Sequence, residues 1–289
     1  MNRMLLLLWL SGSLLHTASA DSLTFNLAKE LLSENSYELS AVEFRRFAME
    51  TDKEPDQAAA YLYSSYAYLK SNDGSTASEM LDRAENADAA SDYSRDHTLL
   101  SAENARLMRD ADTALYFYDV LSSGAGGIDF QTFAHRRAAA IYLSQYNLEA
   151  ARQELENSPT DETRSIQTLE DFASGADKSP LVGGLWGLIP GAGHWYSGEV
   201  ANGFRSLILN SLFIFGMVST AENEDWGAFA IITFFEITWY SGSIYGGVDA
   251  AQRYNQNRLD TALNEIEGNM SYRPDPEIVV PLFKLNIHF

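Results

Sequence analysis

Two long apolar segments, separated by four polar residues, constrain the fold of this 289-residue chain more than any other feature. They run over about Gly203–Ala221 and Trp226–Val248, and each approaches the roughly 20 residues that a helix needs to cross a bilayer. Arg205 is the single basic residue from Ser179 to Val248. The core of a soluble helical domain is the alternative, but segments this continuous favour a membrane domain over residues 179–250.

A shorter apolar stretch, Leu181–Ile189, comes before these two segments and ends at Pro190. If it crosses the bilayer, the domain has three crossings, and after export of the N-terminus its Lys and Arg residues lie on the cytoplasmic side. If it is only re-entrant, there are two crossings and that charge pattern is reversed. The shortness of the stretch and its proline favour two crossings, whereas charge favours three, and we expect three.

A glycine-rich turn follows this stretch, with the sequence Gly191-Ala192-Gly193-His194-Trp195-Tyr196-Ser197-Gly198. Together with Pro190 before it and Asp249 at the end of the last segment, the turn resembles that of a small membrane-hairpin family with the pattern Pro-Gly-x-Gly-x-x-Tyr-x-Gly. The resemblance implies an architecture and no reaction. Proline stops a helix and glycine permits tight turns and close helix contacts, so we expect a structural role for Pro190, Gly191, Gly193, Tyr196, Gly198 and Asp249.

Glu236 is the one carboxylate in the middle of an apolar segment. An ionisable group inside a bilayer is costly and is a functional candidate, which makes a transport or proton-linked role one hypothesis. Alternatively, Glu236 is neutral, or it is hydrogen-bonded to Ser211, Thr233 or Thr238.

Residues 21–177 read as short amphipathic helices separated by polar turns. Ala41, Ala77, Ala114 and Ala150 recur at spacings of 36, 37 and 36 residues, each near the start of a helix. Small residues at such a period allow helix pairs to pack closely. The region resembles a tetratricopeptide-repeat array like those of periplasmic scaffold proteins; an irregular helical bundle is the alternative. We expect Leu99, Leu115, Tyr118 and Leu121 in its core.

Arrays of this family offer a groove for a protein or peptide partner. Four tyrosines, Tyr61, Tyr63, Tyr66 and Tyr68, lie on one expected helix. Tyr61 and Tyr68 fit the packing positions of the repeat, which leaves Tyr63 and Tyr66 as candidates for partner binding.

The two ends of the chain carry their own patterns. A basic residue, an apolar run and Ala18-Ser19-Ala20 predict a cleaved signal peptide over residues 1–20, with an uncleaved anchor as the alternative. After a polar helix, residues 251–289 end in an extended tail in which Phe283, Leu285, Ile287 and Phe289 alternate with polar residues. Such a strand is expected to pair with a partner or a second copy of the chain, unless the alternation is chance.

Composition excludes several functions. The net charge of −20 opposes nucleic-acid binding, and with no cysteine there is no thiolate metal site or cysteine nucleophile. No catalytic motif, metal site or cofactor site is apparent.

The sequence thus predicts an all-α protein, a tetratricopeptide-like array followed by a small transmembrane bundle. We expect an exported scaffold, anchored in a bacterial envelope membrane, that binds a protein partner; a transport accessory subunit using Glu236 and the glycine-rich turn is the alternative.

Overall fold

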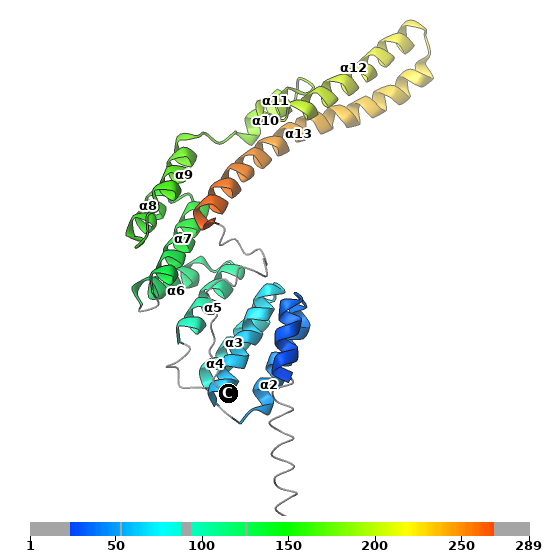
Figure 1. Cartoon of the computed structure of the whole chain (residues 1–289). Coiled ribbons are helices and arrows are strands. Elements are labelled where there is room, and N and C mark those ends of the chain that lie inside the picture. Colours follow the sequence, from blue (N-terminus) through cyan, green and yellow to red (C-terminus); the bar gives the residue numbers. More distant parts are fainter. Residues whose placement is uncertain (1–23, 53, 88–93, 125–126, 269–289) are drawn as a thin grey trace, which may run out of the picture. The chain divides into compact units, whose positions relative to one another are not determined.

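The computed structural model describes residues 24–52, 54–87, 94–124 and 127–268, and these residues form helices and no strand (Figure 1). A helix over residues 24–33 is followed by α2 (Tyr37–Glu50), α3 (Glu54–Lys70), α4 (Gly74–Ala87), α5 (Ser94–Leu107), α6 (Ala111–Ser123), α7 (Ile128–Ser144), α8 (Leu148–Asn157), α9 (Thr163–Ser174), α10 (Pro180–Trp186), α11 (Ala192–Tyr196), α12 (Val200–Glu222) and α13 (Trp226–Glu267). The all-helical class is confirmed for the described residues. The expected signal peptide and the C-terminal tail with Phe283, Leu285, Ile287 and Phe289 lie outside them.

The described residues divide into two compact units, 24–163 with 267–268, and Arg164–Ile266. The sequence placed its boundary later, near residues 177–179, so α9 belongs with the second unit rather than with the helical array.

Consecutive helices of the first unit, from α2 to α8, pack side by side in chain order. One core cluster includes Phe44, Leu62 and Met80, and the next is built around Leu99, Tyr118 and Phe133. Of the core residues expected from the sequence, Leu99, Tyr118 and Leu121 are buried. Leu115 is only half-buried, at the edge of the second cluster. The face of α6 that points into the core carries Ala114 and Tyr118, and Leu115 lies beside that face.

The turn inside each helix pair repeats with a constant spacing of 37 residues. Asn35, Asn72, Arg109 and Tyr146 each have a positive φ, of 60°, 64°, 60° and 58°. A residue in this left-handed conformation ends a helix and lets the chain reverse. The next residue starts the following helix: the side chains of Asp73, Asp110 and Asn147 accept hydrogen bonds from backbone N–H groups three residues on, at 3.0, 3.1 and 3.2 Å. The same left-handed turn therefore joins the two helices within each of four pairs, and a capping hydrogen bond follows it in three of them, Ser36 making none.

The small residue of the repeat lies five positions after the residue with positive φ. Ser40, Ala77, Ala114 and Ala151 are all fully buried at this position. The alanine pattern expected from the sequence was therefore one residue out at both ends, where it used Ala41 and Ala150. In the first pair, the serine hydroxyl donates a hydrogen bond of 2.8 Å to the backbone carbonyl of Ala28, so a polar residue fills the place of the alanine.

A buried cluster of charged side chains connects α5, α6 and α7. Glu103 accepts a hydrogen bond of 2.6 Å from the Tyr118 hydroxyl and lies 3.3 Å from the Arg137 guanidinium, which is 2% exposed. Burial would raise the pKa of Glu103, but Arg137 and Arg106 outweigh it and hold that pKa below its ordinary value. The two arginines also pair with Glu267, the last residue of α13, at 2.5 Å from Arg137 and 3.7 Å from Arg106, so each charge in the cluster has an opposite partner.

The second unit is dominated by the hairpin of α12 and α13, which run in opposite directions (Figure 1). The turn between them repeats the motif of the array: Glu224 has φ 58°, and the Asp225 carboxylate accepts a hydrogen bond of 3.2 Å from the Ala228 N–H.

The expected third crossing is wrong, because α10 is too short to span a bilayer. Its seven residues give a helix of about 10 Å, whereas the hydrocarbon core of a bilayer is about 30 Å thick. The chain leaves the helical conformation after Trp186, turns at Pro190 and starts the short α11. The stretch Leu181–Ile189 is therefore not a spanning helix.

Candidate functional site

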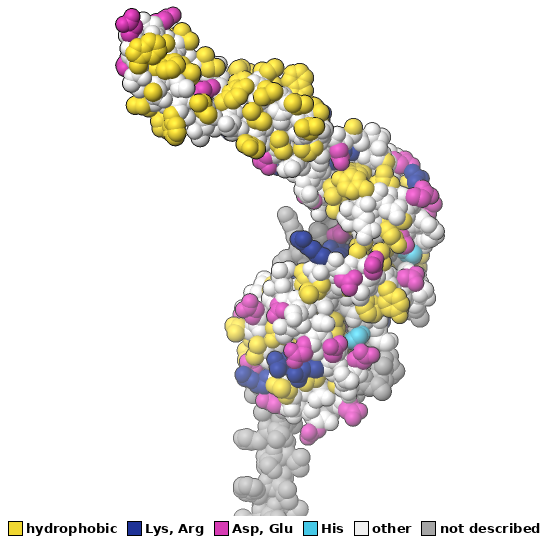
Figure 2. All heavy atoms as spheres, turned by 180° about the vertical axis from the view of Figure 1, so that it is seen from behind, with side chains coloured by type: hydrophobic (Ala, Val, Ile, Leu, Met, Phe, Trp, Pro, Cys, Tyr) yellow, Lys and Arg dark blue, Asp and Glu magenta, His cyan; other side chains and the backbone are white. Residues whose placement is uncertain are grey.

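The outer surface of the α12–α13 hairpin is apolar. Figure 2 shows hydrophobic side chains gathered over most of its length, with acidic side chains at its far end. Phe215 and Phe234 are 72% and 68% exposed, and the other large exposed residues of the two helices include Phe204, Ile208, Leu212, Ile214, Val218, Trp226, Ile231, Phe235, Ile237, Trp239 and Tyr245. Among the described residues, α12 is the one helix both long and apolar enough to cross a membrane.

The inner face of the hairpin is made of polar and small residues. Asn210 is 0% exposed and Glu236 7%, while Gly203, Ser243 and Gly247 are also buried. A soluble helix buries its apolar face and exposes its polar one, so this hairpin has the opposite arrangement. Small residues at a helix contact allow the two backbones to approach closely.

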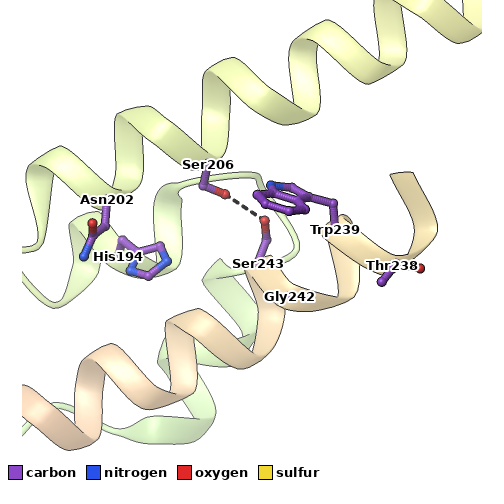
Figure 3. Close-up of a pocket in the computed structure, with 7 residues that line it drawn as sticks. All are labelled: His194, Asn202, Ser206, Thr238, Trp239, Gly242 and Ser243. Atoms are coloured by element: carbon purple, nitrogen blue, oxygen red, sulfur yellow. Dashed lines mark hydrogen bonds between the residues drawn. The ribbon is translucent and has the colours of Figure 1, made fainter. Parts of the chain in front are cut away.

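Hydrogen bonds across the hairpin join Ser206, Asn210 and Ser243. The Ser206 and Ser243 hydroxyls lie 2.7 Å apart, and the Asn210 amide donates to the Ser243 hydroxyl at 3.2 Å and to the Ser206 carbonyl at 2.7 Å. The two serines line a groove of about 380 Å³ together with His194, Asn202, Thr238, Trp239 and Gly242 (Figure 3). The sequence did not single out Ser206, Asn210 or Ser243, although polar residues inside an apolar segment were a usable signal.

Glu236 lies on the same inner face of α13, seven residues from Ser243. None of the partners suggested by the sequence binds its Oε2 atom, which has no hydrogen-bond partner among the described residues. Ser211 is exposed on the outside of α12, because its neighbour Asn210 takes the inward position. Thr238 donates to the carbonyl of Phe234 on its own helix, and the Thr233 hydroxyl also has no partner.

The glycine-rich turn is a packing device. Gly193 of α11 lies against Gly183 of α10 and Gly247 of α13; a Cβ on Gly193 would come within 2.6 Å of the Gly183 carbonyl oxygen and 2.8 Å of the Gly247 Cα. Gly191, with φ +87°, contacts the backbone of Gly203, where α12 begins. Gly198 has φ +83° in open space, so it serves the turn and not a close contact.

The remaining turn residues hold α10 and α11 in place. The Tyr196 hydroxyl accepts a hydrogen bond of 3.1 Å from the Ser179 N–H, and the Lys178 ammonium lies 5.0 Å from the Tyr196 ring centre. The chain has left the helix by Leu188, two residues after α10 ends, and the Leu188 carbonyl accepts a hydrogen bond of 2.7 Å from the Tyr240 hydroxyl on α13.

A network at the base of the hairpin, where α12 starts, ties α11, α12 and α13 together. Arg253 donates two hydrogen bonds to the Glu199 carboxylate, at 2.8 and 3.0 Å, and also pairs with Asp249. Glu199 accepts a further bond of 2.8 Å from Asn202 and lies 3.1 Å from His194 Nδ1. Burial acts to raise the pKa of Glu199, but these hydrogen bonds hold it below its ordinary value. Asp249 thus takes part in a structural ion pair.

The two candidate partner-binding tyrosines of the array are both half-buried on α3. The Tyr63 ring stacks on Phe44, with 4.9 Å between ring centres, which gives it a packing role in the first core cluster. Tyr66 packs against the same cluster, with Lys70 5.7 Å from its ring centre. Burial raises the pKa of Tyr66 to about 12, with Tyr37 contributing in the same direction.

No protein-family model, curated protein or solved structure matches this chain.

Proposed function

We propose that this protein is an exported, membrane-anchored scaffold in which the helical array binds a protein or peptide partner and the α12–α13 hairpin inserts into the bilayer. The observation that carries the proposal is the inverted hairpin: Phe215 and Phe234 point outward while Asn210 and Glu236 are buried. Water would penalise this arrangement and hydrocarbon would favour it.

Hairpin dimensions support two crossings. The 23 residues of α12 give about 35 Å of helix, enough to cross a hydrocarbon core of about 30 Å. The acids Glu222, Glu224 and Asp225 would lie at one membrane surface and the Glu199–Arg253 network at the other. Trp195 and Trp226 fall near these two levels, where amphipathic rings are favoured.

A scaffold role for the array is supported by its construction. The 37-residue turn motif and the buried small residue recur through four helix pairs, as in tetratricopeptide-like repeats, which bind partners through the first helix of each pair. Among the described residues, no group of three or more His, Asp or Glu side chains is arranged to hold a metal ion. A helical surface for a partner is the function that this unit supports best.

Site-specific photo-crosslinking tests the scaffold. A photoreactive phenylalanine analogue replaces Tyr66 on α3 in one variant and Tyr116 in another. Tyr116 is 64% exposed on α6, the second helix of its pair, and serves as the matched control. After irradiation of intact cells, we expect a discrete adduct from position 66 and none from position 116. Adducts of equal yield from both positions, or from neither, would contradict a partner groove on the first helices.

One observation still supports the alternative of a transport accessory subunit: Glu236 is buried inside the hairpin. The glycine-rich turn no longer supports it, because Gly193 and Gly191 are occupied by backbone contacts.

A further inference from the structure

Glu236 differs from the other acidic side chains of the second unit by its surroundings. Glu199 pairs with Arg253, Asp177 with Arg258, and the acids Glu222, Glu224 and Asp225 are exposed. Glu236 is 7% exposed, and its Oε2 atom has no hydrogen-bond partner among the described residues.

The charged groups on the helices around Glu236 either bind other residues or lie far from Glu236 along the hairpin. On α12 these are Arg205 and Glu222, and Arg205 donates a hydrogen bond of 3.2 Å to Asn202, toward the base of the hairpin. The Ser206–Ser243 contact sets the register, so Arg205 lies near the level of Ser243, seven residues or about 10 Å along α13 from Glu236.

Among the described residues of α10, α11 and α13, no cationic side chain without a partner lies near Glu236. Helix α10 carries no charged residue, and on α11 His194 lies 3.1 Å from the Glu199 carboxylate. On α13 itself, the next charged residues toward the base are Asp249 and Arg253, which pair with each other. No ion pair to Glu236 occurs among the described residues.

We propose that Glu236 is un-ionised at neutral pH and forms a proton-binding site inside the α12–α13 hairpin. A carboxylate placed there would be buried with neither a cation nor a full set of donors, and such a group takes up a proton instead. The protonated carboxyl gains an O–H donor. Thr233, one helical turn away on the same face, carries a hydroxyl that is also unpartnered. The ligand is therefore a proton, and its release would put a charge between the two helices.

This inference rests on the proposed membrane placement of the hairpin, and its test separates the two. The full-length chain is reconstituted in phosphatidylcholine vesicles, and its infrared spectrum at neutral pH is compared with that of Glu236→Gln. We expect the difference spectrum to contain the C=O band of an un-ionised carboxyl. Glu222→Gln, which removes an exposed acid at the far end of α12, should instead remove carboxylate bands. Carboxylate bands in the Glu236→Gln difference would overturn the proposal.

A second measurement needs no variant, in case Glu236→Gln fails to fold. With ¹³C-labelled glutamate carboxyls in the wild-type chain, one signal at neutral pH should lie at the position of an un-ionised carboxyl and shift only in alkaline buffer. If every glutamate signal lies at the ionised position, Glu236 holds no proton. Co-sedimentation with the vesicles after alkaline extraction reports on membrane insertion separately, because the carboxyl spectra read the state of Glu236 whether or not the chain is inserted.

Discussion

The hydroxyl of Ser206 on α12 lies 2.7 Å from the hydroxyl of Ser243 on α13, inside a hairpin whose outer surface is apolar. The contact joins residues 37 positions apart and fixes the register of the two helices. Asn210 donates to the same serine. Polar contacts therefore join the inner faces of the two helices, while their outer faces are apolar. This arrangement suits a solvent of hydrocarbon, in which apolar side chains gain little by facing one another.

Alanine substitutions at two glycines of α13 should have opposite effects. A Cβ on Gly247 would overlap the carbonyl oxygen of Gly183, whereas a Cβ on Gly242 meets nothing within 4 Å. We expect Gly247→Ala to lower the free energy of unfolding by about 1–3 kcal/mol, the usual cost of overpacking. Gly242→Ala should be neutral or stabilising, because alanine favours a helix. Unfolding of the full chain in detergent micelles, followed by circular dichroism, measures both; equal stabilities would show that α10 does not pack on α13 as described.

Single cysteines should report the sidedness of the hairpin, since the chain has no cysteine of its own. Two crossings put the α12–α13 turn on the opposite side of the membrane from the array. If the array is exported, an impermeant thiol reagent should label Asp112→Cys on α6 in cells with a permeabilised outer membrane. Asn223→Cys should be labelled only after lysis.

Each other labelling pattern has its own meaning. The acidic turn contains no Lys or Arg, so the positive-inside tendency favours the reverse orientation. Labelling of Asn223→Cys alone would therefore place the array in the cytoplasm and contradict the export signal. Labelling of both positions would mean that the hairpin does not cross.

The array should fold without the hairpin. A fragment of residues 21–163 is expected to be soluble and helical, because its helices cover one another in chain order. Leu99→Asp should unfold this fragment, since burying an unpaired charge costs several kcal/mol. Leu115→Asp makes the same change at a half-buried position and should be better tolerated. Thermal unfolding by circular dichroism compares them, and a larger loss for Leu115→Asp would mean that the register of α6 is different.

Lys70 should make the stability of the array depend on alkaline pH. Burial lowers the pKa of Lys70 from 10.5 to about 8, with nearby Glu103 opposing the change. Between about pH 8 and 10.5 the unfolded chain therefore holds a proton that the folded chain has released, so stability rises with pH across this window. Lys70→Met should remove that rise.

Nuclear magnetic resonance of ¹³C-labelled lysine measures the Lys70 pKa directly. The chain has five lysines, so assignment by the Lys70→Met spectrum is practical. A Lys70 signal that titrates near 10.5 would contradict its burial against Tyr66.

Several features of this protein were readable from the sequence because they depend on local patterns. Apolar runs and amphipathic periodicity predicted the all-helical class and the helices now seen as α12 and the first half of α13. Proline and glycine act on the backbone where they stand, so the sequence predicted a turn over Gly191–Gly198; in the structure Gly191 and Gly198 have positive φ, with α11 between them. The alanine spacing predicted a period of 36–37 residues, and the turns of the structure recur every 37. Ala41 and Ala150 are each one residue from the recurring buried position, because a serine stands there in the first pair and two alanines are adjacent in the last.

Tertiary structure alone decided which polar residues of the hairpin face inward. Ser211 and Asn210 are neighbours in the sequence, yet only Asn210 reaches Ser243, because a helix turns adjacent residues by about 100° and the partner helix selects one of them. The contact of Gly183, Gly193 and Gly247 likewise joins three helices, and no spacing in one segment could reveal it. Sequence determined the helices and their turns through local backbone preferences. The interior of the hairpin, including the isolation of Glu236, was decided by the register in which α12 and α13 meet.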